Sequence, residues 1–581
     1  MEKLKYTEIL QLNKSLAENK FSNVYEIGIL SNVIVNSYKE VLEYKLRLND
    51  VEPRIEIGNF DNIIQDSAGF VSKNLVLVFY DTLNIIDNVS GFFEEISNEQ
   101  LNELKLKLTT ELDIVFSNLR NCPCVVFNLF SAAYYPSVFT DFLKVEELVN
   151  ELNNYLIKYK PSNFILADIN KIYISEGIKN CIDIRFYISS KAPYTFTFFK
   201  NYVQSLENVL LKNIGKLKKA IIFDCDNTLW KGVVGEDGMK GIDMSSNSNF
   251  GKYFNIVQHF AVYLSTKGVI IGICSKNNEQ DVLDVLNNHK DMILKEEHIV
   301  IKKINWVDKA TNLREIALEL NIGLDSLVFI DDSSFEINLI KEQLPEVLTI
   351  QVPTKASEYL DTISKVVYSK FNLTPTDDDV KKTEIYKQQF DREKSKNTYA
   401  SIDDYLASLQ IELKIDKDNL SNIQRLSQLT QKTNQFNLTT IRYTENQITQ
   451  LVNSEKSYVY AVFVKDKFGD SGLTGLCIVK QDYKEKLNVN IDTFLMSCRI
   501  IGRNIEYAII DVIIKNMVQM GYTKISASYI RSDKNIQADS FYESIGFDLI
   551  KHEDGIKNYT LNIDENYINR NSFINVIKEF D

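Results

Sequence analysis

Three short apolar runs in the middle of the chain each end in polar or charged residues. They are AIIFDCD (220–226), VIIGICSKNN (269–278) and SLVFIDDSS (326–334), and stretches that suit helices separate them. Regular alternation of strands and helices predicts a parallel sheet covered by helices, and the carboxyl ends of parallel strands line one crevice. Because burying an unpaired carboxylate costs roughly several kcal/mol, the acids at these strand ends need a cation or hydrogen bonds.

The side chains expected in this crevice combine acids with one hydroxyl and one ammonium: Asp224, Asp226, Ser275, Lys309, Asp331 and Asp332. Lys309 stands at the start of a predicted helix in INWVDKATNLREIALEL, and Cys225 points away from the two acids because side chains alternate along a strand. Carboxylates from separate strands repel one another unless a hard cation lies between them, and Mg²⁺ prefers such oxygen ligands. The pattern therefore favours a Mg²⁺ site for phosphoryl chemistry, and the alternative is a set of ordinary capping groups.

This arrangement resembles the haloacid dehalogenase (HAD) superfamily of aspartate-nucleophile phosphotransferases over about 150 residues. The motif DxDxT is met by Asp224, Asp226 and Thr228, and the later motifs by Ser275, Lys309 and Asp331-Asp332. The resemblance implies that Asp224 attacks phosphorus, while Asp226 is the general acid and base and gives Mg²⁺ its backbone carbonyl. It also implies that Ser275, Lys309 and Thr228 hold the phosphoryl group and that Asp332 is a further metal ligand.

The whole chain of 581 residues is too long for one core, and its pattern changes along its length. Strand-like runs alternate with helices in residues 1–205 and again in 206–370, which predicts two α/β domains. Residues 371–400 are polar and are interpreted as a linker helix. Residues 401–581 give helices, a hairpin, a long helix and further strands, which predicts an α+β domain.

The C-terminal part carries a turn with Arg499, Gly502 and Arg503 before a long amphipathic stretch. Backbone N–H groups at a helix start and two guanidinium groups make a phosphate site. With the helix NIQADSFYESIGF, which contains Tyr542, the turn resembles the R-x-x-G-x-[GA] motif of N-acetyltransferase-type (GNAT) folds, except that Asn504 stands where a small residue is expected. The aromatic residues of that helix are equally consistent with core packing.

Two further features in this part have two interpretations each. Cys498 adjoins Arg499 and a predicted helix start, which favours a nucleophilic thiolate, and the alternative is a small buried residue. The amide-rich stretch QKTNQFNLTTIRYT (431–444) either reads a polyhydroxylated acyl chain or pairs with backbone at a strand edge.

The run of FDCDNTLWKGVVGEDG, KTNQFNLTT, DKFGDSGLTG and SCRIIGR, from about residue 215 to the C-terminus, is similar to the FkbH-like family. The resemblance implies a glyceryltransferase-phosphatase that takes 1,3-bisphosphoglycerate and loads a glyceryl unit onto the phosphopantetheine thiol of an acyl carrier protein, in polyketide-type biosynthesis. The GNAT-like pocket, with Arg499, Gly502, Arg503 and Tyr542, is then expected to bind the pantetheine arm. Cys498 as a transient glyceryl thioester is a separate hypothesis, motivated by its position beside Arg499.

The N-terminal domain resembles a degenerate SGNH-hydrolase fold. Its first predicted strand ends in GILSN, which places Ser31 where that family has its nucleophile. The family's Asp-x-x-His is missing, and no histidine occurs before His259. A serine without its base is a poor nucleophile, so this domain is interpreted as structural or docking.

Composition excludes several classes of partner. The net charge of −13 and the absence of Lys/Arg blocks argue against nucleic acid, and no apolar stretch reaches the ~20 residues of a membrane span. Seven scattered cysteines suit a reducing cytoplasm. The alternatives to the glyceryl-loading function are a Mg²⁺-dependent phosphatase of a small phosphomonoester with a regulatory GNAT-like domain, a non-catalytic protein that binds the carrier, and an acetyl-CoA-dependent N-acetyltransferase.

Overall fold

The structure is a computed structural model that describes residues 4–21, 23–86, 92–133, 143–373, 401–482, 485, 487–532, 534–564, 567 and 574–580. Its contacts divide the chain into two compact units. Unit 1 comprises Met1–Asn213 and Arg442–Gln450, and unit 2 comprises Ile214–Ile441 and Leu451–Asp581. No helix among the described residues is long and apolar enough to cross a membrane.

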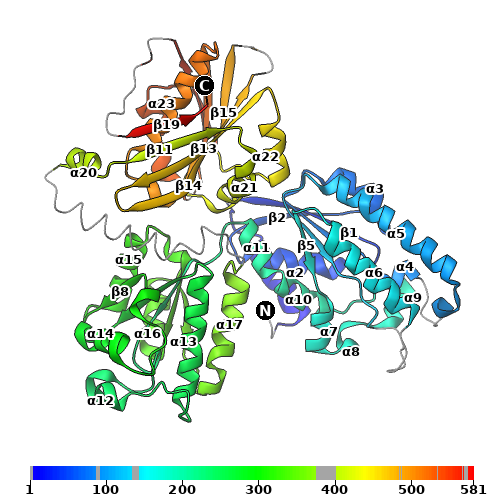
Figure 1. Ribbon diagram of the computed structural model, residues 1–581. Coiled ribbons are helices and arrows are strands. Elements are labelled where there is room, and N and C mark those ends of the chain that lie inside the picture. Colours follow the sequence, from blue (N-terminus) through cyan, green and yellow to red (C-terminus); the bar gives the residue numbers. More distant parts are fainter. Residues whose placement is uncertain are drawn as a thin grey trace. The chain divides into compact units, whose positions relative to one another are not determined.

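Unit 1 contains a parallel five-stranded sheet in the order β2-β1-β3-β4-β5 (Figure 1). The strands are β1 (Val24–Ser31), β2 (Glu52–Ile57), β3 (Leu75–Phe79), β4 (Val125–Asn128) and β5 (Phe164–Ala167). The helices are α1 (Tyr6–Leu16), α2 (Asn36–Arg47), α3 (Ile63–Ser67), α4 (Thr82–Ile86), α5 (Asn98–Leu119), α6 (Lys144–Tyr159), α7 (Asn170–Glu176), α8 (Ile178–Cys181), α9 (Ile184–Ser190), α10 (Phe196–Ser205) and α11 (Glu207–Asn213). Strands β1, β3, β4 and β5 form from the apolar runs VYEIGILSN, LVLVFYD, CPCVVFNLF and NFILADIN, which are predicted as strands. Strand β2 was not predicted, because EPRIEI is too polar to read as a buried strand.

Residues Arg442–Gln450 belong to unit 1 although they lie far along the chain. They include most of α22 (Glu445–Val452), whose Asn446 and Gln447 side chains donate hydrogen bonds to Asn121. One segment from the later part of the sequence is therefore an element of unit 1.

The middle sheet, in unit 2, is also parallel and five-stranded, in the order β10-β9-β6-β7-β8 (Figure 1). Its strands are β6 (Ala220–Phe223), β7 (Ile270–Ser275), β8 (Ile301–Ile304), β9 (Leu327–Asp331) and β10 (Leu348–Gln351). The helices are α12 (Val234–Gly241), α13 (Gly251–Thr266), α14 (Glu279–Asn288), α15 (Lys309–Glu319), α16 (Ser334–Gln343) and α17 (Tyr359–Lys370). One buried cluster joins α13, α14 and α17 to the sheet, and a second joins α15 and α16 to it, so both faces are covered as the sequence predicts.

The C-terminal sheet of unit 2 is mixed, in the order β17-β18-β16-β15-β14-β13-β11-β19, with β12 paired to β15. Its strands are β11 (Glu412–Lys417), β12 (Phe436–Asn437), β13 (Ser457–Asp466), β14 (Gly469–Gln481), β15 (Asn488–Met496), β16 (Lys524–Ile530), β17 (Asp548–Glu553), β18 (Ile556–Asn562) and β19 (Asn575–Glu579). The helices are α20 (Ile402–Ser408), α21 (Ile423–Lys432), α23 (Ile505–Gln519) and α24 (Phe541–Ser544). The predicted hairpin is β13–β14, and the interpretation of 371–400 as a linker helix falls almost wholly on residues 374–400, outside the described residues.

The segment Phe436–Leu438, which begins with β12, lies where β15 and β16 stop pairing with each other. The two strands pair in parallel from Asn488 to Ile491, and the end of β15 then pairs with β12. The next residue, Leu438, donates its N–H to Phe494 O and accepts one from Ile530 N. Asn437 is buried and bonds Thr433 and Thr440, so backbone pairing is the correct interpretation for this part of the amide-rich stretch.

Candidate functional site

Four of the predicted residues occupy the carboxyl edge of the middle sheet. Ser275 is the last residue of β7, Asp331 is the last of β9, and Lys309 is the first of α15. Asp224 follows β6 and continues its pairing, because its N–H donates to Ile330 O. Since β6 lies between β7 and β9, the strand order changes direction here, which is where open α/β sheets form their binding crevices.

Lys309 joins two of the carboxylates. Its Nζ lies 2.9 Å from Asp224 Oδ1 and 2.5 Å from Asp331 Oδ2, and all three side chains are buried. Asp331 also accepts a hydrogen bond from Ser333 N, which fixes the turn after β9. The prediction that these strand ends converge is therefore confirmed by the geometry.

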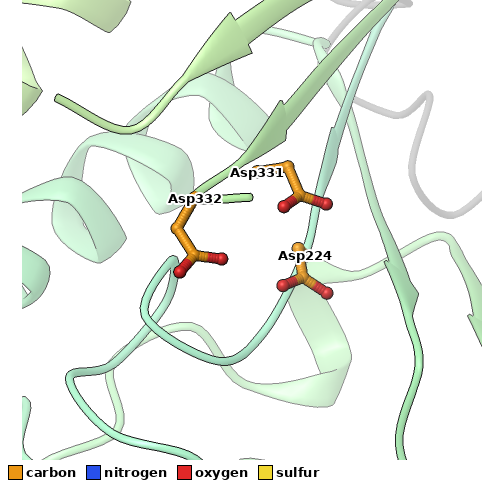
Figure 2. A group of neighbouring side chains, drawn as sticks. All are labelled: Asp224, Asp331 and Asp332. Carbon is orange, nitrogen blue, oxygen red and sulfur yellow. The ribbon is translucent and has the colours of Figure 1, made fainter. Parts of the chain in front are cut away.

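Asp332 completes a set of three carboxylates. Asp224, Asp331 and Asp332 each offer an oxygen, and these atoms lie within 4.8 Å of one another (Figure 2). Figure 2 shows the three groups facing one shared space from the ends of two neighbouring strands. Such a cluster of hard oxygen donors fits a cation of the Mg²⁺ type, which takes a few carboxylates and keeps water and phosphate oxygens as its other ligands.

The charges of this cluster are not balanced by protein groups alone. Burial raises the pKa of Asp224 to about 6, repulsion from Asp331 adds to this effect, and Lys309 offsets only part of it. The pKa of Asp332 is raised as well, by burial and by Asp331. Burial acts to lower the pKa of Lys309, but the two carboxylates outweigh burial and raise it, so the ammonium stays charged. One ammonium therefore pairs with two of the three carboxylates, and a further cation would balance the cluster.

Asp226, the second acid of the first motif, is held by the loop that follows it. Its Oδ1 accepts hydrogen bonds from Trp230 Nε1 and Val234 N, both at 2.9 Å, and its Oδ2 accepts one from Asn277 Nδ2 at 2.9 Å. Asn277 Nδ2 also donates to Ser275 Oγ at 3.1 Å. The sequence reading gave no role to Asn277, although its place in SKNN directly after a strand end was a usable signal.

Thr228, the last residue of the DxDxT motif, lies under the site. It is buried, and its Oγ1 has no hydrogen-bond partner within the described part of the chain. Its backbone carbonyl accepts a hydrogen bond from Tyr359 at 3.1 Å, which ties the motif to α17. Cys225 is buried, in agreement with its predicted place in the core.

The turn before α23 is built differently from the sequence expectation. Helix α23 begins at Ile505, and Cys498 lies in a separate 3-10 turn (Cys498–Ile500), so the prediction that Cys498 adjoins the helix start is wrong. Gly502 and Asn504 have φ values of 81° and 58°, in the left-handed region. Asparagine is the residue that tolerates this region best after glycine, so Asn504 suits the backbone of the turn.

Two of the residues predicted to bind pantetheine, Arg503 and Tyr542, are engaged within the protein. Arg503 is buried, pairs with Asp466 at 2.9 Å and donates to Arg499 O. Tyr542 is buried among Phe541, Phe547 and Tyr559. The core-packing interpretation of the aromatic helix therefore describes Tyr542, and a pantetheine role for it and for Arg503 stays a prediction.

Arg499 and Cys498 each have a polar or reactive group that could contact a ligand. Arg499 Nε donates to Ser497 Oγ at 3.1 Å, and its buried Nη1 has no hydrogen-bond partner in the described part of the chain. Cys498 is half-buried, whereas the other six cysteines are buried and all seven are free thiols. Cys498 is thus the thiol of this chain that a second molecule reaches most easily.

In unit 1, Ser31 ends β1 as predicted, but it lies in a closed polar cluster. Its Oγ accepts a hydrogen bond from Val33 N, and its side chain is buried. Nearby, Asp81 bonds Tyr194, Leu83 N and Asn32 through its side chain and backbone. The structural or docking interpretation of this domain stays a prediction.

Comparisons with known proteins give a fold for part of the chain. No family model matches, and no curated protein matches. Among solved structures, the N-terminal part of the protein BF1531 from Bacteroides fragilis, "containing phosphatase domain complexed with Mg", matches at 22% identity and a TM-score of 0.53, and covers 64% of this chain and 100% of its own. An acetyltransferase from Thermus thermophilus matches at 14% identity and a TM-score of 0.22, covering 27% of this chain and 99% of its own. The ribosomal-protein-S18-alanine N-acetyltransferase from Escherichia coli matches at 12% identity and a TM-score of 0.21, with the same two coverages. The first of these supports a shared fold.

Proposed function

We propose that the middle domain is a Mg²⁺-dependent phosphatase or phosphotransferase that uses Asp224 as its nucleophile. The observation that carries this proposal is the set of three neighbouring carboxylates, Asp224, Asp331 and Asp332, of which Lys309 pairs with only the first two. Mg²⁺ fits the missing positive charge, with Asp224, Asp332 and the backbone carbonyl of Asp226 as its protein ligands. The similarity to the BF1531 structure, which contains a phosphatase domain complexed with Mg, supports the same assignment.

Each residue of the site has a separate role in the proposed phosphoryl transfer. When bound, Mg²⁺ supplies positive charge that offsets the phosphoryl oxygens and lowers the barrier to attack by an anion. Asp224 attacks phosphorus, and Lys309 and Ser275 hold the phosphoryl oxygens beside it. Asp226 protonates the leaving oxygen, and Asn277, which bridges Asp226 and Ser275, holds the acid at a set distance from the phosphate site.

The fuller proposal is that this enzyme takes 1,3-bisphosphoglycerate, removes its phosphates and loads the glyceryl unit onto the phosphopantetheine thiol of an acyl carrier protein. The motifs shared with the FkbH-like family support it, as do the accessible Cys498 thiol and the unpaired Nη1 of Arg499 in the turn before α23. An acyl phosphate is activated at C1, so transfer of the acyl group to a thiol is downhill. The glyceryl unit on the carrier protein would then enter polyketide-type biosynthesis.

Intact-protein mass spectrometry tests this function directly. A holo acyl carrier protein is incubated with the enzyme, Mg²⁺ and 1,3-bisphosphoglycerate, and a gain in mass equal to a glyceryl group is expected. An Asp224→Asn enzyme serves as the control and is expected to give a phosphoglyceryl gain or none. If the native enzyme releases phosphate but leaves the mass of every carrier tested unchanged, glyceryl loading is wrong.

A simple phosphatase is the second candidate. The pairing of Arg503 with Asp466 and the burial of Tyr542 favour it, because they leave few groups to receive a pantetheine arm. It predicts Mg²⁺-dependent release of phosphate from several small phosphomonoesters, and no acyl-carrier product.

A further inference from the structure

We infer that the amino edge of the middle sheet is the docking surface for the acyl carrier protein, where it binds the anionic groups at the base of the carrier's pantetheine arm. The inference rests on the proposed function and adds the place at which the partner binds. The surface is a group of lysines at the edge of the sheet opposite the phosphatase site. We call it the lysine cluster, and its members are Lys218, Lys219, Lys370 and Lys534.

The lysine cluster lies where the strands of the middle sheet begin. Lys218 and Lys219 come directly before β6, and Lys370, the last residue of α17, accepts a backbone hydrogen bond from Lys218 N at 2.9 Å. Lys534 comes from the C-terminal part of unit 2, and its Nζ lies 2.7 Å from Asp325 Oδ2. Asp325 stands in the turn just before β9. Three separate parts of the chain therefore bring ammonium groups to one edge of the sheet.

The lysine cluster carries more positive charge than Asp325, the carboxylate that pairs with it, can balance. Lys218 Nζ donates to the backbone oxygens of Asp325 at 2.6 Å and of Glu346 at 3.3 Å, which are uncharged groups. Burial lowers the pKa of Lys218 to about 8, and the Asp325 carboxylate opposes this effect. Repulsion from Lys370 and Lys534 acts in the same direction as burial. An additional anion at this edge would relieve that repulsion.

The net charge of the whole chain makes this local surplus informative. At a net charge of −13, the protein as a whole repels an acidic partner, so association is guided to a positive surface. A phosphopantetheinylated carrier has at least one anion at the base of its arm, which is the phosphodiester that joins the arm to the protein. Acidic side chains around that base add to the attraction. The lysine cluster therefore complements the carrier in charge.

The form of the lysine cluster suits a protein surface better than a single small anion. Lys219 is exposed, and the side chain of Lys534 is 37% exposed. Lysine carries a compact charge on a flexible stem, whereas the guanidinium group of arginine offers the fixed fork of donors that matches one phosphate. Lysines on separate elements can instead pair with several anionic groups spread over the face of a partner.

The turn that holds Asp325 also contacts the segment of the accessible thiol. Asn321 Nδ2 donates to Cys498 O at 3.1 Å, and Gln435 Nε2 donates to Asn321 Oδ1 at 3.4 Å. Asn321 and Asp325 are four residues apart in the sequence, so at most about 14 Å of extended chain separates them. A carrier whose arm begins at the lysine cluster therefore starts close to Cys498.

The phosphatase site lies at the other edge of the same sheet. Strand β9 begins two residues after Asp325 and ends at Asp331, and its five residues span roughly 16 Å at about 3.3 Å per residue. A partner bound at the amino edge therefore leaves the carboxyl edge open to a phosphate ester. Docking of the carrier and hydrolysis of a small phosphate ester use separate surfaces in this arrangement.

Fluorescence anisotropy of a labelled holo acyl carrier protein tests the docking surface with the whole protein, without Mg²⁺ or an acyl donor. Lys219→Glu and Lys534→Glu are each expected to raise Kd about tenfold and to weaken its dependence on salt, because each reverses a charge at the interface. Lys219→Glu changes an exposed side chain, so its unfolding temperature should match that of the native protein. Lys355→Glu is the matched control and should leave Kd nearly unchanged, because Lys355 follows β10 at the other edge of the sheet and its side chain is 78% exposed.

Two results would overturn the inference in this binding measurement. One is the absence of carrier binding by the native protein, or equal Kd values for the native protein and both cluster variants. The other is complete displacement of the carrier by inorganic phosphate at constant ionic strength, which would assign the lysine cluster to a small anion.

Failure of the proposed function is distinguishable from failure of the docking surface. Carrier binding that depends on Lys219 and Lys534, without a glyceryl gain in the mass measurement, would reject the loading reaction and keep the surface. A normal glyceryl gain with an unchanged KM for the carrier in both variants would reject the surface and keep the reaction.

Discussion

The two parallel sheets of this protein both place polar side chains at the ends of their strands, but they satisfy those groups in different ways. In unit 1, Asp81 and Asn128 are buried and bonded to neighbouring backbone and to Asn32 and Tyr194. In the middle sheet, Asp224 and Asp331 share the Lys309 ammonium, and Asp332 adds a third carboxylate beside them. The first arrangement closes its crevice with protein groups, and the second keeps unbalanced charge for a ligand.

The difference teaches that a polar residue at a strand end is not by itself evidence of a site. Neutral donors and acceptors can satisfy each other at little cost, whereas several buried carboxylates can be satisfied only by cations. The charge balance of a cluster at strand ends therefore distinguishes a ligand-binding site from ordinary capping residues better than the position of the cluster in the sheet does.

Loss of the nucleophile is expected to give the largest difference between the two sheets. Asp224→Asn should lower Mg²⁺-dependent phosphatase kcat by at least about a thousandfold, because no neighbouring group replaces the attacking carboxylate. Ser31→Ala, at the corresponding strand end of unit 1, should leave kcat within about twofold. Steady-state phosphate release measures both, and a large loss in the Ser31 variant would contradict the comparison.

Loss of the central ammonium should be the next largest effect. Lys309→Met leaves two buried carboxylates facing each other, so the free energy of unfolding should fall by about 3 kcal/mol without metal, and Mg²⁺ should restore part of it. Tyr194→Phe, which removes a donor to Asp81, should cost about 2 kcal/mol. Urea unfolding with and without Mg²⁺ distinguishes them, because Mg²⁺ should not rescue the Tyr194 variant.

The pH dependence of stability should reveal the unbalanced charge of Asp224. Its pKa is about 6 in the folded protein and about 3.8 in the unfolded chain, so between these values the folded protein holds a proton that the unfolded chain has released. Without metal, this group's contribution is present below pH 4 and is lost as the pH rises through 6, which amounts to about 3 kcal/mol. The difference in unfolding free energy between native protein and Asp224→Asn should follow this course, and excess Mg²⁺ should remove it. A difference that stays constant from pH 4 to 7 would show that Asp224 is not destabilised.

Removal of the Asn277 bridge should give the smallest of these effects. Asn277→Ala takes a donor from both Asp226 and Ser275, so kcat should fall about tenfold with a smaller change in KM. Asn278→Ala, the neighbouring residue, caps α14 instead and should leave kcat nearly unchanged. Equal effects of the two variants would mean that the loop, and not the bridge, is responsible.

Much of this comparison was predictable from the sequence, because strand ends can be read from apolar runs. AIIFDCD, VIIGICSKNN and SLVFIDDSS predicted three of the strands of the middle domain. Together with INWVDKATNLREIALEL they predicted the convergence of Asp224, Ser275, Lys309 and Asp331. The hydrogen bonds of Asp226 were not predictable, since Trp230, Val234 and Asn277 meet it only through the path of two loops.

The C-terminal part was less predictable for a related reason. The ion pair of Arg503 with Asp466 joins the turn before α23 to the end of β13, and periodicity carries no information on such a pair. Strand β12 is only two residues long, so no pattern of alternation exists to reveal it. The α+β character was nevertheless evident from the hairpin and the long helix.

The segment from Phe436 to Leu438 has a consequence for any measurement of arm binding in the C-terminal sheet. Its backbone is already bonded to the ends of both β15 and β16. A pantetheine arm that bound between these two strands would have to replace the backbone hydrogen bonds that the segment Phe436–Leu438 already makes. Its apparent affinity would therefore report the difference between two nearly equivalent sets of hydrogen bonds, and not the strength of either set.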